Sequence, residues 1–107
     1  MISIKNRFDG NIIHKGPFKN IKDCIFDAVF WNKSLVGADL SGQDLSGISL
    51  KNVNLSKCSL RNSNLEKTNL TGAILEYANL YGVNLKGCCL KKTKMYGAFF
   101  GGTYYHI

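Results

Sequence analysis

Residues 36–60 read VGADLSGQDLSGISLKNVNLSKCSL, and every fifth residue of this stretch is leucine. The spacing continues to the end of the chain. Fourteen positions carry a bulky apolar side chain: Leu40, Leu45, Leu50, Leu55, Leu60, Leu65, Leu70, Leu75, Leu80, Leu85, Leu90, Met95, Phe100 and Tyr105. This period fits neither the roughly 3.6 residues of an α-helix nor the roughly 2 of a flat strand. It predicts a solenoid, in which each repeat stacks on its neighbour and continues one core.

The residues around each bulky position are also regular. The residue two places before it is nearly always small or β-branched, as at Ala38, Ser63 and Val83. The residue just before it is often Asp or Asn: Asp39, Asp44, Asn54, Asn64, Asn69, Asn79 and Asn84. Glycine recurs two places after it. Because Asn and Gly turn a backbone at little cost, each pentad predicts an inward pair of side chains followed by a corner.

These pentads resemble the pentapeptide-repeat family, whose consensus is A(D/N)LXX. Ala38-Asp39-Leu40, Ala78-Asn79-Leu80 and Val83-Asn84-Leu85 match it, whereas Ile74 and Lys94 depart from the Asp/Asn position. The resemblance covers about two-thirds of the chain. It implies an all-β solenoid, a right-handed quadrilateral β-helix with four pentads per coil, and so about 3.5 coils over residues 36–105. Residues twenty apart should then stack, which pairs Glu66 with Lys86, Lys57 with Tyr77 and Arg61 with Tyr81 on the outside.

The first 35 residues follow a different pattern. Two β-branched runs, 2–8 and 11–15, flank Asp9-Gly10, which predicts a β-hairpin. Residues 20–33 predict a helix with Asn20 as its N-cap. Its apolar stripe follows Ile21 and Ile25, and Phe26 and Phe30 project from a second side, so we expect a helix sandwiched between the hairpin and the first coil. Residues 1–35 would thus cap a solenoid of residues 36–107 within one structural domain, as in some bacterial and phage members of the family.

No arrangement of residues in the sequence points to catalysis, a metal or a cofactor. The two histidines, His14 and His106, lie near opposite ends, and the cysteines show no zinc-binding spacing. Cys58 and Cys88 share the phase of the small inward residues, which predicts buried thiols in a reducing compartment. No apolar run is long enough to cross a bilayer, and the N-terminus lacks a signal-peptide core, so we expect a cytoplasmic protein. Because no catalytic arrangement of residues is present in the sequence, we also expect that the protein is not an enzyme.

The net charge of +7 bears on partners rather than on fold. Lys86, Lys91, Lys92 and Lys94 face no acidic residue within 81–107, and they form a candidate partner surface. Relatives that imitate duplex DNA and inhibit type II topoisomerases have strongly acidic exteriors, which argues against that role here. Direct nucleic-acid binding through these lysines is an alternative, and it would weaken steeply with salt.

Aromatic residues gather at the C-terminus: Tyr96, Phe99, Phe100, Tyr104 and Tyr105. An exposed end with an apolar cross-section favours pairing with a second copy, so one hypothesis is an end-to-end homodimer through the final coil. The alternative is that the aromatics fold over and seal their own end. The function that the sequence favours is a non-catalytic protein–protein interaction module, such as a bacterial or phage accessory or inhibitor protein, with the DNA mimic and the nucleic-acid binder as alternatives.

Overall fold

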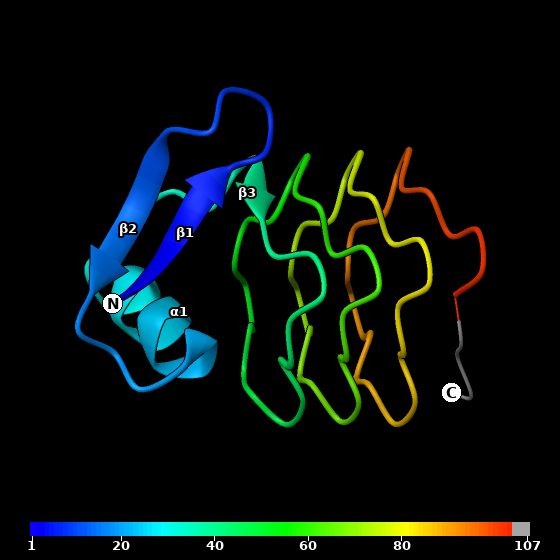
Figure 1. Cartoon of the computed structure of the whole chain (residues 1–107). Helices are drawn as coiled ribbons and strands as arrows, with labels where there is room; N and C mark the ends of the chain where they lie inside the picture. Colours follow the sequence, from blue (N-terminus) through cyan, green and yellow to red (C-terminus); the bar gives the residue numbers. More distant parts are fainter. Residues whose placement is uncertain (104–107) are drawn as a thin grey trace.

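The structure, a computed structural model, describes residues 1–103. A β-hairpin and a helix lie at one end of a stack of coils, and the chain leaves at the other end (Figure 1). The elements are β1 (Ile2–Asn6), β2 (Ile12–Gly16), α1 (Ile21–Phe30) and β3 (Ala38–Asp39). Within this part of the chain, no helix combines the length and apolar character that membrane crossing requires.

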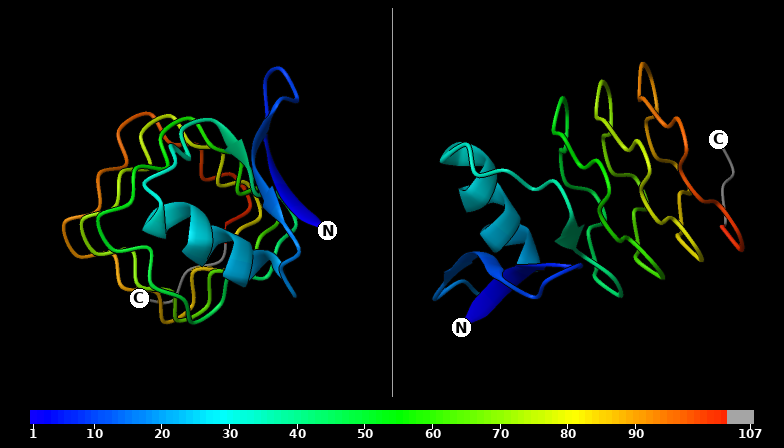
Figure 2. Two further views of the ribbon diagram at one scale, coloured as in Figure 1. Left: turned by 90° about the vertical axis from the view of Figure 1, so that its left-hand side faces the viewer. Right: turned by 90° about the horizontal axis from the view of Figure 1, so that it is seen from above.

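Each coil takes twenty residues. Parallel β-bridges join Asp39 to Ser59, Ser59 to Asn79 and Asn79 to Phe99, and the same spacing holds on the other sides. The bonds come from both flanks of a bridge: the Leu40 N–H donates to Ser59 O at 2.8 Å, and the Ser59 N–H donates to Ala38 O at 2.9 Å. Seen along the stack, the coil has four corners (Figure 2). The predicted solenoid with stacking every twenty residues is confirmed.

The leucine columns form the core. Side chains from Leu40 to Leu80 at every fifth position are fully buried, and Leu85 is 2% exposed. Leu90, Met95 and Phe100 are half-buried and pack against this cluster, because fewer coils lie beyond them. Tyr105 lies outside the described residues.

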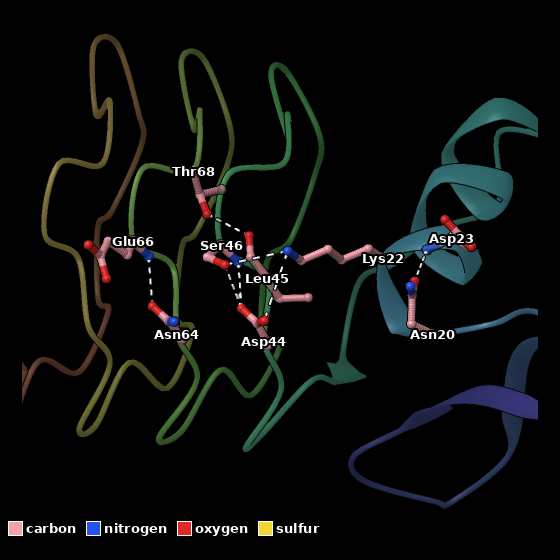
Figure 3. Close-up of polar contacts among 9 residues, drawn as sticks. All are labelled: Asn20, Lys22, Asp23, Asp44, Leu45, Ser46, Asn64, Glu66 and Thr68. Carbon is pink, nitrogen blue, oxygen red and sulfur yellow. Dashed lines mark hydrogen bonds and ion pairs between the residues drawn. The ribbon is translucent and has the colours of Figure 1, made fainter.

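Small inward residues fill the space between the columns, and their hydroxyls are satisfied within the tube. Ser63 Oγ donates to Leu40 O at 2.6 Å. Thr68 Oγ1 likewise donates to Leu45 O at 2.7 Å (Figure 3). Each hydroxyl therefore bonds the preceding coil. Among the described residues, no buried side-chain nitrogen or oxygen lacks a hydrogen-bond partner. In the part of the chain that the structure describes, the buried polar side-chain atoms thus serve to hold the core together.

The corners use the predicted Asp and Asn side chains. In each of the seven pentads, the side-chain oxygen accepts a hydrogen bond from the backbone N–H two residues later, as from Glu66 to Asn64 at 3.0 Å (Figure 3). The second corner residue has a positive φ, whether it is glycine or another residue such as Lys57 or Tyr77. The corner is therefore fixed by the turn itself, and glycine is its least strained occupant.

The N-terminal segment closes the first coil. β1 pairs with β2 and, on its other edge, with β3, where Lys5 lies opposite Asp39. α1 lies across the mouth of the tube (Figure 2). Asn20 caps the helix, because its side-chain oxygen accepts from the Asp23 N–H at 2.9 Å. His14 Nε2 lies 2.8 Å from Asp27 Oδ2 and joins β2 to the helix.

Three details differ from the sequence-based expectations. The strands end at Asn6 and resume at Ile12, because the Asn6 side chain accepts from the loop N–H groups of Phe8 and Asp9 and turns the chain early. The helix ends at Phe30 rather than at residue 33. The helix contacts both the hairpin and the first coil, as expected, but Phe26 and Phe30 on its second side are mostly exposed instead of buried between them.

Candidate interaction surfaces

The four predicted lysines are all exposed and lie on three neighbouring parts of the tube. Lys91 and Lys92 form a corner that stacks below residues 71–72 and 51–52, since the Gly72 N–H donates to Lys91 O at 2.9 Å. We call residues 51–52, 71–72 and 91–92 the lysine corner. Lys94 lies on the adjoining side, where it bridges to Ile74, and Lys86 lies at the preceding corner. Three of the four predicted lysines are therefore brought together.

Lys51 belongs to the same surface, although sequence reasoning did not select it. It lies at the lysine corner in the first coil, two coil spacings from Lys91, which corresponds to about 10 Å. The signal that could have found it was its place forty residues before Lys91, a multiple of the coil length.

Aromatic side chains lie at the next two corners of the coil and on the side between them, after the side that carries Lys94. The Arg61 guanidinium lies 4.9 Å from the centre of the Tyr81 ring, and Tyr81 stacks on Phe99 with ring centres 6.1 Å apart. The predicted Arg61–Tyr81 contact is confirmed. The other two predicted pairs do not form. Tyr77 packs edge-on against Tyr96 and makes no cation–π contact with Lys57. Within residues 1–103 the ion pairs are His14–Asp27 and Lys22–Asp44, and Glu66–Lys86 is not among them.

The predicted self-association end is described only in part. Tyr96 and Phe99 are exposed, but their rings contact tyrosines of the previous coil on the outside of the tube. Phe100 is half-buried against the core. Tyr104 and Tyr105 lie outside the described residues, so the two hypotheses for this end, pairing with a second copy and self-sealing, both stay predictions.

A groove runs between α1 and the first coil, and sequence reasoning missed it. Its volume is about 640 Å³. Its apolar wall comes from the exposed side of the helix and from half-buried residues of the coil. The lining residues are Lys22, Asp23, Ile25, Phe26, Val29, Phe30, Ile48, Ser49, Lys51 and Val53. A second hollow of about 450 Å³ shares Val29, Lys51 and Val53 with it and extends towards Lys33. We call the two together the cap groove.

The cysteines divide into a buried and an exposed class. Burial raises the pKa of the Cys58 thiol to about 12 and that of Cys88 to about 11, and burial also raises the pKa of Cys24. Cys58 and Cys88 are thus the buried small residues that the sequence predicts. Cys89 is exposed, and a hydrogen bond with the Thr71 hydroxyl, aided by the Lys91 backbone and charge, lowers its pKa.

One carboxylate, that of Asp44, also has a shifted pKa. Hydrogen bonds from the Ser46 hydroxyl and backbone N–H lower the pKa of Asp44, and Lys22 contributes from 3.9 Å away (Figure 3). These bonds hold a corner rather than a reacting group. In residues 1–103, no group of three or more His, Cys, Asp or Glu side chains is placed to hold a metal ion.

The coil, its corners and its leucine columns define a solenoid built from five-residue units. The family model "Pentapeptide repeats" matches residues 34–72 and 63–102 with eight copies of the repeat. The chain belongs to the pentapeptide-repeat family. Members of this family fold as right-handed quadrilateral β-helices and are generally non-catalytic proteins that mediate protein interactions.

Solved structures of pentapeptide repeat proteins resemble the chain. Rfr23 from the cyanobacterium Cyanothece 51142 is 37% identical, over 64% of this chain and 54% of its own, with a TM-score of 0.40. A protein from the Arabidopsis thaliana thylakoid lumen is 27% identical, over 61% of this chain and 59% of its own, with a TM-score of 0.33. QnrB1, a plasmid-mediated fluoroquinolone resistance protein, is 25% identical, over 56% of this chain and 37% of its own, with a TM-score of 0.27. The chain thus covers less than two-thirds of the length of each. A search of curated proteins found no match.

Proposed function

We propose that this protein is a non-catalytic interaction module that binds a protein partner in the cytoplasm, as a bacterial or phage accessory or inhibitor protein. One observation carries the proposal: lysines and large apolar side chains stay exposed next to each other on a framework in which, within residues 1–103, the buried side-chain nitrogen and oxygen atoms are all hydrogen-bonded. Phe26 and Phe30 are 75% and 68% exposed, beside Lys51. Exposed apolar groups rimmed by charge are typical of sites that bind other proteins.

A pull-down from a bacterial lysate tests the proposal. The bait is the full chain, and the matched variant carries Lys91→Glu, Lys92→Glu and Lys94→Glu, all at exposed positions. We expect the native bait to retain proteins after nuclease treatment and the variant to retain less. The proposal fails if the native bait retains nothing above empty resin, or if nuclease removes everything that it retains.

Nucleic-acid binding is the second candidate, and it rests on the same lysines. It predicts a mobility shift of single-stranded or duplex DNA that disappears as salt rises. The reason is that lysine side chains bound to phosphates displace counterions from the DNA, and added salt opposes this displacement. A topoisomerase-binding DNA mimic has less support. Residues 36–107 carry eight basic and four acidic side chains, and a phosphate mimic needs the opposite balance.

Self-association through the last coil is a further proposal, and it concerns assembly rather than partner choice. Tyr96 and Phe99 supply exposed apolar area near that end. Light scattering at tens of micromolar would give twice the monomer mass if the homodimer forms. A monomer mass at that concentration would remove the homodimer and leave the sealed end.

A further inference from the structure

We propose that the cap groove binds an acidic, amphipathic segment of a partner protein, with its apolar side chains against α1 and its carboxylates on the lysine corner. This inference rests on the proposed interaction function and names the chemistry of the partner. It follows from four features of the groove: exposed aromatics, a floor in the first coil, the sign of the rim charge, and an extension along the tube.

The first feature is an exposed apolar wall. Phe26 and Phe30 of α1 are 75% and 68% exposed, and Val29, which is 40% exposed, lies between them and the buried residues of the helix. Trp31, which is 65% exposed, packs edge-on against Phe30 with ring centres 5.2 Å apart and extends the wall. Large aromatic anchors in a recess supply most of the binding energy in typical interfaces.

The second feature is that the first coil completes the recess. Ile48 and Val53 are half-buried, and both line the groove opposite the helix. A ligand there would contact apolar groups on two sides. Its volume of about 640 Å³ can take several apolar side chains of a peptide.

The third feature is the sign of the rim charge. The residues that line the cap groove include Lys22, Lys33 and Lys51 and the acid Asp23, and Asp44, which is not a lining residue, pairs with Lys22 at 3.9 Å. Lys33 and Lys51 therefore set a positive rim. A second copy of this chain would place like charges face to face, which disfavours self-pairing at this surface. An acidic segment complements the rim, and the attraction would also speed its association.

The fourth feature is the extension of this surface along the tube. The lysine corner begins at Lys51 in the groove and continues along the tube to Lys91 and Lys92. The adjoining side of the tube carries Asn54, Ile74 and Lys94 in three successive coils. Ile74 therefore continues the apolar wall, and Lys94 continues the basic rim. An extended segment reaches both regions, whereas a small molecule in the groove would not touch the lysines of the third coil.

A peptide selection tests the inference directly. A random-peptide phage library is panned on the native chain, and the enriched peptides are measured by fluorescence anisotropy. We expect sequences with net negative charge and spaced apolar residues. Phe26→Ser with Phe30→Ser should weaken binding about tenfold or more, as expected for loss of anchor residues. Phe8→Ser is the matched control, because Phe8 is 68% exposed and lies outside the groove.

The charge component has its own variants. Lys51→Glu, and separately Lys91→Glu with Lys92→Glu, should weaken the same peptides and reduce the salt dependence of binding. Lys15→Glu changes the charge as much as Lys51→Glu does, at an exposed position on β2 away from the groove, and should leave binding nearly unchanged. Circular dichroism of each variant confirms that the coil is intact.

The outcomes separate this inference from the proposed function. Selected peptides that are basic or uncharged, or that ignore the Phe26 and Phe30 substitutions, overturn the groove assignment. An oligonucleotide of equal charge that competes fully with the peptides also overturns it, and so does a dimer that the groove substitutions dissociate. If proteins from a lysate still bind the native chain in those cases, the interaction function stands without this site. If no protein binds, both proposals fail.

Discussion

At the scale of single residues, the corners show how neighbouring coils share space. A large side chain at the second corner position lies over a glycine one coil later: Asn52 over Gly72, and Tyr77 over Gly97. A Cβ at Gly97 would meet the Tyr77 ring at 2.6 Å. The glycines therefore serve two purposes, since they accept positive φ and leave room for the side chain stacked on them.

Gly72→Ala should be more destabilising than Gly47→Ala. Both glycines have positive φ, +69° and +72°, so each alanine costs about 1 kcal/mol in backbone strain. At Gly72 the new methyl also collides with Asn52 Oδ1, whereas Gly47 has open space. Chemical denaturation of both variants measures the difference. In an Asn52→Gly background the excess cost at Gly72 should vanish, and its persistence would contradict the collision.

Cys89 should be the first thiol to react. Its lowered pKa gives more thiolate near neutral pH than an ordinary cysteine has, so its alkylation rate should rise at lower pH than that of a free thiol. Cys58 and Cys88, with pKa values raised to about 12 and about 11, should stay unmodified until the protein unfolds. Peptide mass spectrometry after iodoacetamide treatment across a pH series reports all four sites. Thr71→Val should move the Cys89 midpoint upwards, and an unchanged midpoint would rule out the hydroxyl as the cause.

At the scale of elements, α1 depends on its first turn. Asn20→Ala removes the side-chain oxygen that accepts from the Asp23 N–H, and we expect a loss of about 1 kcal/mol in the free energy of unfolding. Asn11→Ala is the control, because Asn11 is exposed in the hairpin loop and forms hydrogen bonds through its backbone N–H and carbonyl. If urea denaturation shows equal effects of the two substitutions, the Asn20 cap does not contribute to the stability of the helix.

The elements also show which parts of the molecule a sequence can predict. The leucine columns, the Asp and Asn corners and the buried Cys58 all follow from local repetition, because every coil imposes the same environment on the same phase. The exposure of Phe26 and Phe30 does not, since it depends on which side of α1 meets the coil. The cap groove was missed for the same reason. Lys91, Lys92 and Lys94 share one surface because they lie within four residues of one another. The Glu66–Lys86 pair does not form, because ion pairs at a protein surface gain little free energy in water.

At the scale of the whole molecule, stability comes from contacts between successive coils. Leu65 is fully buried in the middle of its column, so Leu65→Ala should cost about 2–5 kcal/mol. Leu90→Ala should cost less, because Leu90 is only half-buried near the end of the stack. Guanidinium denaturation of the two variants gives the comparison, and equal costs would contradict a core that weakens towards its last coil.

The twenty-residue spacing of the bridges also governs how this surface can change over generations. Duplicating or deleting one whole coil would leave every later side chain on the side of the tube that it now occupies. Losing a single pentad would instead turn everything downstream by a quarter of a revolution, and Lys91, Lys92 and Lys94 would leave the side that continues the cap groove. The leucine columns would survive that rearrangement, since each side of the coil offers the same interior. A short deletion could therefore preserve the fold and abolish recognition, so partner choice in such a chain can be altered by length as readily as by substitution.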